Sequence, residues 1–365
     1  MNWASGGAKE YNAELCKRGA DALGQALALT ESTNRYELAD FSEYNDIFLL
    51  HNSSGKLNGV KESIFMENIK DYSGRWRWNM VNDFRPQSIE YSGIKCYPTA
   101  NYVNYYGMQN GYPINDMTKA DAESGYDPTH PWKNRDPRFY KTIMFDGVKW
   151  KSTGGAGGTA ELFTGGRESE EANEKKGCFT AYMNSKLCPQ LMNTVDGYKE
   201  NNIMILSLMR LADVYLMYAE ATAVGYNGPK GKAATYSLTA EEALNKIRER
   251  AGVAPVLDKF LGSTADFLSE LRRERAVELS FEGFRFIDLR RWMLLTQYPY
   301  TLKTKIEFDR ADPSDYNYDE PEENAIKNLR EVVLLERKYT DRHYWYPLPK
   351  KDVSMYEGFY QNPGW

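Results

Sequence analysis

Residues 272–292 carry the densest charged motif of the chain and decide its fold; they read RRERAVELSFEGFRFIDLRRW. On a helix, side chains three or four positions apart lie on the same face. One face of this segment would therefore carry six charged residues, which are Glu274, Glu278, Glu282, Arg285, Asp288 and Arg291. Glutamates this close together need cationic partners, and the segment itself supplies arginines. The pattern predicts an ion-pair network that fastens helices to one another.

The same segment allows a second interpretation and also predicts part of the core. Paired carboxylates beside arginine are also the arrangement of a glycosidase acid and nucleophile. We favour the network, because structural ion pairs often resemble active sites. The rings of the segment would expose a large apolar patch if they faced water, so we expect them to fill the core. They are Phe281, Phe284, Phe286 and Trp292.

Helical patterns flank this motif and continue towards the start of the chain. The first predicted helix is an apolar run that ends at Gly225, and the charged residues within it exclude a membrane span. A capping box at Thr239–Glu242 opens the second helix. Gly283 should bend or split the third. Small residues in the first two allow close antiparallel packing, as in tetratricopeptide-like hairpins. The predicted helices are 203–224, 239–250 and 264–295, with 8–30 and 41–50 near the start.

Between residues 71 and 200 the regular periodicity fades. Gly, Pro, Asn, Asp and Tyr dominate there. A structureless loop of this length is uncommon in a compact domain, so we expect ligand-presenting loops held by short strands. One predicted strand is Arg138–Phe145, turning at Asp146-Gly147, and another covers Glu62–Ile69 just before the loops.

Composition narrows the function classes. The 365 residues are 42% hydrophobic and 27% charged, which is typical of one or two folded domains. The net charge of −5 argues against nucleic acid as a partner. The 3 His are scattered, and the 4 Cys lack CxxC spacing, so we expect no metal site. Cys178 and Cys188 either pair locally or remain buried thiols. No phosphate-binding, dinucleotide, serine-hydrolase or zinc-protease motif is present, so we expect neither a cofactor nor an enzyme.

Aromatic residues point to a binding surface. They make up 14% of the chain. The 27 Tyr outnumber the 15 Phe, which is typical of rings that have one edge in contact with water. Flat rings stack on the apolar face of a sugar, while Arg and Asn bond its hydroxyls. Trp76 and Trp78, two residues apart, would face the same side of an extended segment. The alternative is that each ring anchors a loop. The candidate ligand-binding residues are Trp76, Trp78, Asn79, Arg85, Tyr97, Tyr105, Trp132 and Trp150.

A series of short motifs runs in order from the loops to the end of the chain. They read PTANYVN at 98–104, NGYPI at 110–114, NRDPRFY at 134–140, RLADVYLMYAEA at 210–221, LNKIRERAG at 244–252, YPLP at 346–349 and QNPGW at 361–365. Together with the segment at 272–292, they resemble the SusD/RagB family of surface lipoproteins from Bacteroidetes. The resemblance extends from about residue 8 to the end.

The resemblance implies a mostly α-helical protein, in which a tetratricopeptide-like helical scaffold carries a large irregular, loop-rich ligand-binding side with short strands. We expect three regions: helices in 1–58, ligand-binding loops in 59–200 and a helical region in 201–365. The family's leader, lipidated cysteine and first helical repeats have no counterpart at the start of this sequence. We therefore expect it to represent the later part of such a protein.

The resemblance also implies a function. Members capture oligosaccharides at the outer surface of the outer membrane, held there by a lipid anchor, and deliver them to a SusC-like TonB-dependent outer-membrane transporter. Some members bind peptides instead. The resemblance thus implies a non-enzymatic glycan-binding protein, with a peptide-binding module and, less favoured, a glycoside hydrolase as the alternatives.

Overall fold

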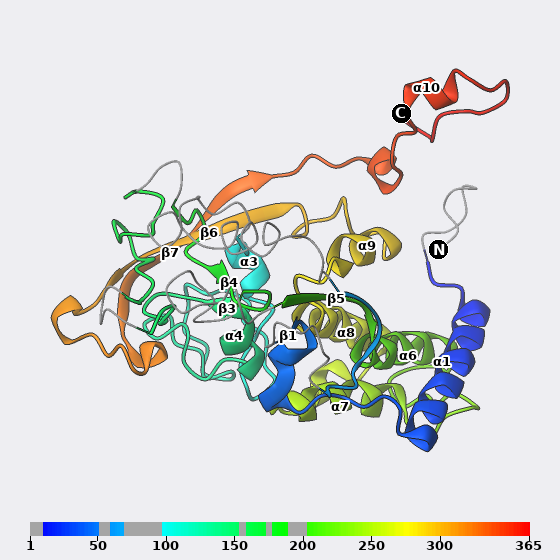
Figure 1. Cartoon of the computed structure of the whole chain (residues 1–365), viewed down its shortest axis with the longest axis horizontal. Helices are drawn as coiled ribbons and strands as arrows, with labels where there is room; N and C mark the ends of the chain where they lie inside the picture. The colour runs from blue at the N-terminus through cyan, green and yellow to red at the C-terminus, as the bar shows by residue number, and fades with distance from the viewer. Residues whose placement is uncertain (1–9, 51–58, 69–96, 153–157, 173–176, 189–202) are drawn as a thin grey trace.

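Helices gather at one end of the molecule and irregular loops at the other (Figure 1). The structure, a computed structural model, describes residues 10–50, 59–68, 97–152, 158–172, 177–188 and 203–365. Within these residues, no helix is long and apolar enough to cross a membrane. The predicted region boundaries, at 58/59 and 200/201, both touch segments outside the described residues and stay predictions.

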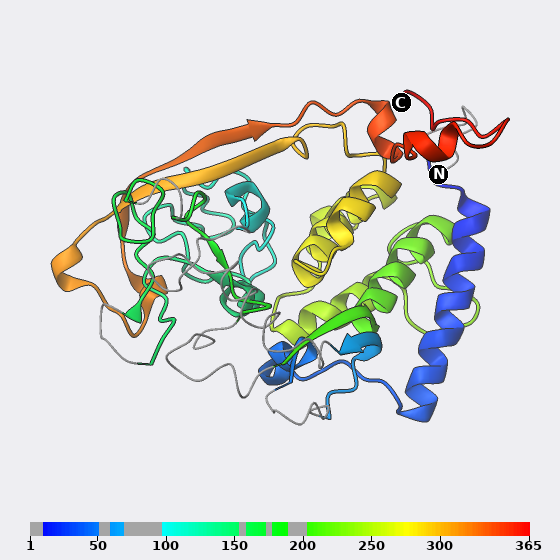
Figure 2. The ribbon, with the colours of Figure 1, turned by 45° about the horizontal axis from the view of Figure 1, so that its top comes forward.

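The helical end is built around one central helix, α6. It lies between α1 and α7, and α8 packs against it as well (Figure 2). The predicted small residues allow this approach, since Ala212, Ala219 and Ala243 are fully buried. This mostly helical, tetratricopeptide-like arrangement confirms the predicted fold class. The helices are α1 (Ala13–Thr33), α6 (Leu211–Gly225), α7 (Ala240–Ala251), α8 (Thr264–Glu278) and α9 (Phe284–Arg291).

Local signals set the ends of α7 and the break between α8 and α9 as predicted. The Thr239 side chain accepts from the Glu242 amide and the Glu242 carboxylate accepts from the Thr239 amide, which completes the capping box of α7. Gly252 ends the helix at a φ of 72°. Gly283, at a φ of 88°, separates α8 from α9. Glycine suits both positions because it adopts the left-handed region without a steric penalty.

The prediction of one helix over 203–224 is wrong in its first third. The run IMILSLMR forms strand β5 (Ile203–Arg210), and α6 begins only at Leu211. Strand β5 is the centre of a three-stranded antiparallel sheet, between β1 (Leu49–Leu50) and β2 (Ser63–Asn68). A short apolar run fits a buried strand and a buried helix equally well, so only its partners decide. The strand predicted over 62–69 is confirmed.

The loop-rich end contains only short elements. The strand predicted over 138–145 is mostly helical, because the Asp136 side chain caps the Arg138 amide and Pro137 occupies the first turn of α4. Only its end enters a strand, β3, which pairs with β4. The predicted turn at Gly147 is present, with a φ of 82°. The elements are α3 (Ala100–Val103), α4 (Pro137–Thr142), β3 (Ile143–Met144) and β4 (Met183–Asn184).

A long antiparallel hairpin, which the sequence patterns did not reveal, covers the loops. Strands β6 (Leu302–Arg310) and β7 (Ile326–Glu336) run along one side of the loop-rich end (Figure 1). Alternate residues of β6 are buried, among them Ile306 and Phe308, which join the core of the loops. The short remaining elements are η1 (Phe41–Ile47), where a longer helix was expected, η3 (Asp258–Phe260), η4 (Pro313–Asp315), η5 (Pro321–Glu323), η6 (Asp341–Tyr344) and α10 (Lys350–Val353).

Helix α8 lies between two hydrophobic cores. Its Phe267 and Leu271 pack among the helices, while Val277 packs among the loops. Cys178 and Cys188 do not pair with each other, and both are buried. The two ends of the molecule therefore meet along α8, and the residues on this helix decide how they are joined.

Candidate functional site

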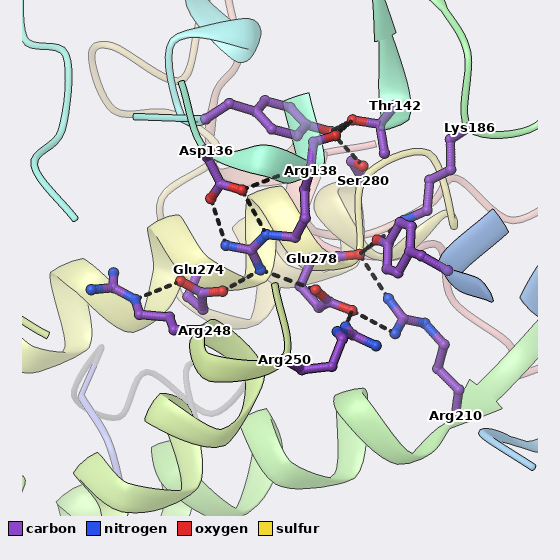
Figure 3. A network of polar contacts seen from close by, with 12 residues as sticks. Asp136, Arg138, Thr142, Lys186, Arg210, Arg248, Arg250, Glu274, Glu278 and Ser280 are labelled. Atoms are coloured by element: carbon purple, nitrogen blue, oxygen red, sulfur yellow. Dashed lines mark hydrogen bonds and ion pairs between the residues drawn. The ribbon is translucent and has the colours of Figure 1, made fainter. Parts of the chain in front are cut away.

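The glutamates of α8 lie in a buried ion-pair network (Figure 3). Glu278 is 0% exposed and receives hydrogen bonds from Arg138 at 3.0 Å, Arg210 at 2.7 Å and Arg250 at 2.5 Å. These arginines come from α4, β5 and α7. Lys186 donates to the Glu278 backbone carbonyl at 2.8 Å. One carboxylate thus joins the loops, the small sheet and the helices.

Glu274, one helical turn earlier, extends the network towards the loops. Its carboxylate accepts from Arg138 and, at 2.9 Å, from Arg248 of α7. Arg138 also makes a bidentate pair with Asp136, with its Nε 3.0 Å from Oδ1 and its Nη2 2.7 Å from Oδ2. All four side chains are at most 2% exposed. The glutamates that share a face of α8 therefore act as the predicted fastener.

The electrostatics of Glu278 confirm a structural role. Burial alone would raise its pKa, but Arg250, Arg210 and Arg138 outweigh burial and hold the pKa well below its usual range. A glycosidase acid needs the opposite, a carboxyl that stays protonated near neutral pH. Glu278 is also closed off from any substrate. The network interpretation of this motif is confirmed over the glycosidase interpretation.

Two expectations about the same motif are wrong. Phe286 is 36% exposed and tilts against Tyr346 instead of filling the core. Arg285 does not join the network, although Asp288 and Arg291 do form ion pairs, with Arg275 and Glu220. The helical register ends before Arg285, because α8 ends at Glu278 and α9 begins only after Gly283; Arg285 lines a cavity instead.

This cavity has a volume of about 670 Å³ and lies between α8, α9 and the β6–β7 hairpin. Its size falls in the range typical of small-molecule sites, roughly 300–1,000 Å³. The lining combines rings with polar side chains, which include Asn101, Asn104, Tyr105, Glu270, Arg273, Arg285, Tyr298, Tyr300, Thr304 and Glu331. It therefore offers both stacking faces and hydrogen-bonding groups.

A set of hydrogen bonds fixes the walls of the cavity. Asn101 connects α3 to β6. Its side-chain amide donates to the Leu302 carbonyl at 2.8 Å, and its backbone amide donates to the Thr304 hydroxyl at 2.9 Å. Thr304 in turn donates to Glu331 at 2.6 Å. On the opposite wall, Arg273 donates to the Tyr105 carbonyl at 3.1 Å. These bonds make the polar lining rigid before any ligand arrives.

Two lining residues, Asn104 and Tyr105, carry further polar groups. The Oδ1 atom of Asn104 is buried and has no hydrogen-bond partner among the residues that the structure describes. An unsatisfied buried acceptor costs free energy, which a ligand hydroxyl could recover. Burial raises the pKa of Tyr105, so its phenol stays neutral and can donate or accept a hydrogen bond.

The structure brings only part of the predicted site together. Tyr105 lines the cavity. Trp132 is fully buried, and its ring stacks on that of Phe145 with 5.0 Å between the ring centres. Trp150 is only 4% exposed. Both rings therefore belong to the core, as in the alternative that each ring anchors a loop. Tyr97 is partly buried, with its ring 5.6 Å from Phe179. Trp76, Trp78, Asn79 and Arg85 lie outside the described residues.

The cavity also contains residues that the sequence analysis missed. Asn101 and Asn104 belong to the motif at 98–104, so their position in that motif was a usable signal. Tyr300 and Arg285 gave no comparable signal, because the unpredicted hairpin and the break at Gly283 bring them here. In the described part of the chain, no group of three or more His, Cys, Asp or Glu side chains is arranged to hold a metal ion.

Comparison with known proteins identifies the class. The sequence profile of the SusD family matches residues 61–365, and the chain belongs to this family. No curated protein sequence matched it.

Solved structures share the fold. A SusD-like protein from Bacteroides fragilis NCTC 9343 superposes with a TM-score of 0.68 at 23% identity, covering 96% of this chain and 62% of the other. A SusD-like carbohydrate-binding protein from the same organism superposes with a TM-score of 0.61 at 19% identity, covering 94% of this chain and 62% of the other. The chain thus spans less than two thirds of the length of these structures.

Proposed function

We propose that this chain binds oligosaccharides at the cell surface and passes them, chemically unchanged, to a TonB-dependent outer-membrane transporter. Membership of the SusD family and the description of a relative of the same fold as carbohydrate-binding support glycans as the ligand class. The observation that carries the proposal is the cavity beside α8, whose lining combines tyrosine rings with polar side chains.

The chemistry of the cavity suits a sugar. The rings of Tyr105, Tyr298 and Tyr300 supply flat faces for the C–H side of a pyranose. Asn104, which also lines the cavity, has an amide that can bond a hydroxyl. A purely apolar ligand would leave the polar groups of the lining unpaired. A polyhydroxylated ligand therefore fits the lining better than a hydrocarbon does.

The acids of the cavity support binding without hydrolysis. Burial alone would raise the pKa of Glu270, but Arg273 and Arg248 outweigh it and lower the pKa to about 2. Glu331 accepts a hydrogen bond from Thr304 at 2.6 Å. A glycosidase needs one acid with a raised pKa opposite a second carboxylate. Glu270 is shifted in the wrong direction for that task.

Membership of the family supports a proposal for the transporter and the location. We infer an outer-surface position with a lipid anchor and a SusC-like transporter as the partner. Transfer to such a partner needs reversible binding, and a cavity lined by rings and by charged and neutral polar side chains is compatible with release. Pull-down of the protein with a co-expressed SusC-like transporter would test this step.

Calorimetric titration against a panel of oligosaccharides and peptides tests the ligand class. We expect at least one glycan to bind and Asn104→Ala to weaken it about tenfold, which corresponds to 1.4 kcal/mol. Because Asn104 Oδ1 has no partner in the described structure, this variant should keep its melting temperature. Tyr360→Ala, an 82% exposed ring near the C-terminus, is the control and should bind normally.

Three results would contradict the proposal. Sustained release of reducing sugar from any glycan of the panel would show catalysis. Binding of peptides without any glycan would favour the peptide-binding alternative. Glycan binding that is unchanged in Asn104→Ala would show that the site lies elsewhere on the chain.

A further inference from the structure

The aromatic side chains that line the cavity differ in whether they pack against a core. Tyr105 packs against the core of the loops, Phe260 against that of the helices, and Tyr300 against the small cluster around Leu289. Tyr298 lines the same cavity, but it joins none of the hydrophobic clusters of the described residues and is 76% exposed. A ring that lines a cavity and is this exposed lies at its opening.

The more buried rings also have cationic partners. The guanidinium of Arg285 lies over two of them, 4.7 Å from the ring centre of Tyr105 and 5.5 Å from that of Tyr300. The ammonium of Lys259 lies 5.6 Å from the ring centre of Phe260. These three rings are therefore engaged within the protein, and little of their surface remains for a ligand.

Tyr298 has both faces of its ring available. Within the part of the chain that the structure describes, its side chain has no hydrogen bond, no ring contact and no cation over it. An aromatic side chain buries roughly 150–250 Å² when it is fully covered. Tyr298 therefore holds the largest reserve of apolar surface that a ligand at the mouth of the cavity could cover.

The backbone around Tyr298 holds this ring in a defined place. The amide of Tyr300 donates to the Gln297 carbonyl at 2.9 Å, and the amide of Leu302 donates to the Pro299 carbonyl at 3.0 Å. The ring thus projects from a hydrogen-bonded turn between α9 and β6. A platform on such a turn loses less conformational entropy on binding than one on an unrestrained loop.

The inner part of the cavity offers hydrogen bonds in place of free ring faces. Arg285 forms no ion pair with a carboxylate in the described ranges. Its Nη1 is 3.4 Å from the backbone carbonyl of Arg272, a weak hydrogen bond. A guanidinium carries five N–H donors, so Arg285 keeps donors for the hydroxyl oxygens of a sugar. The mouth and the inner part therefore differ in the contacts that they offer.

We propose that Tyr298 determines the length of the ligand, as the stacking platform of an outer subsite, and that the cavity therefore selects glycans of at least two sugar units. One sugar stacks on the Tyr298 ring at the mouth, and the next enters the cavity and bonds to the polar lining around Arg285. This inference rests on the proposed glycan-binding function and specifies the length of its ligand. A single sugar fills only one of the two subsites and loses the contribution of the other.

A length series of sugars tests the two subsites. Malto-, xylo-, manno- and galacto-oligosaccharides of one to six units are titrated, by calorimetry for the longer members and by NMR at millimolar sugar for the monosaccharides. In a series that binds, we expect the affinity of the wild type to rise at least tenfold from one unit to three. Tyr298→Ala should reduce this gain to less than threefold and leave the affinity for the monosaccharide unchanged.

Two matched variants serve as controls. Tyr298→Phe keeps the ring and removes only its hydroxyl, so it should keep the full gain with length. Tyr360→Ala removes an 82% exposed ring that does not line the cavity and should keep the gain as well. Because Tyr298 is exposed and outside the cores, Tyr298→Ala should melt at the temperature of the wild type, and its loss of affinity cannot then be due to unfolding.

The outcomes separate this inference from the function on which it rests. If glycans bind and Tyr298→Ala binds every length as the wild type does, the outer subsite is wrong and glycan binding stands. If Tyr298→Ala weakens the monosaccharide as much as the longer members, selection by length is wrong. If Tyr298→Phe loses as much affinity as Tyr298→Ala, the hydroxyl carries the contact and stacking is wrong. If no glycan of any length binds, the proposed function fails and this inference with it.

Discussion

Replacement of Glu278 by alanine should destabilise the protein more than any change on its surface. The carboxylate is completely buried and accepts hydrogen bonds from Arg138, Arg210 and Arg250, which reach it from three different elements. In the variant, these guanidiniums would lose a carboxylate partner in a region that water does not reach. Arg138 would keep Asp136 and Glu274, but Arg250 would keep only Glu62 in the described structure.

The magnitude follows from buried ion pairs in general. Removal of one partner costs about 3–5 kcal/mol, because a charge is left unpaired in the interior. Unfolding entropy of about 2.1 cal/mol/K per residue gives roughly 0.8 kcal/mol/K for a chain of this length. The expected decrease in melting temperature is therefore about 4–6 °C.

Differential scanning calorimetry at pH 7 measures this change. Glu249→Ala is the matched control, since Glu249 is an exposed glutamate on α7 next to the network residues Arg248 and Arg250. We expect the control to shift the melting temperature by less than 1 °C, as surface substitutions change stability by about 0.5 kcal/mol or less. Equal melting temperatures for Glu278→Ala and the control would refute the assignment of the network as the fastener.

The contribution of Glu278 to stability should depend on pH. The pKa of Glu278 in the folded chain is held well below 4.5, its ordinary value, so its ionisation stabilises the fold above pH 4.5. This contribution is lost as the pH falls below 4.5 towards the folded pKa. The difference in melting temperature between wild type and Glu278→Ala should therefore narrow between pH 5 and pH 3. A difference that widens over this range would contradict the sign of the shift.

Two further predictions concern the ligand loops and a helix end. Trp76→Ala and Trp78→Ala should each weaken glycan binding about tenfold in calorimetric titrations, with little change in melting temperature, if the rings form a stacking platform; unchanged affinity with a large loss of stability would make them loop anchors. Thr239→Ala should lower the free energy of unfolding by about 1 kcal/mol in urea titrations, because it removes the capping bond to the Glu242 amide. An unchanged transition midpoint would contradict this.

Features that depend on neighbouring residues could be predicted from the sequence. The capping box at Thr239, the stop at Gly252 and the break at Gly283 are local, since each involves groups within a few positions of each other. The four-residue spacing of Glu274 and Glu278 likewise placed both carboxylates on one face of a single helix. The motifs in chain order were sufficient to predict the family. The match of the SusD family profile to residues 61–365 confirms this prediction.

Features that depend on distant partners are set by tertiary contacts. The run at 203–210 is a strand because β1 and β2 pair with it, from more than 130 residues earlier. Trp132 is a core residue because Phe145 and Phe308 surround it. Arg285 lines the cavity because the helical register on which its predicted place depended ends between α8 and α9. Local pattern specifies the backbone of an element and the face of a side chain, whereas burial, pairing and charge compensation depend on contacts between segments far apart in the chain.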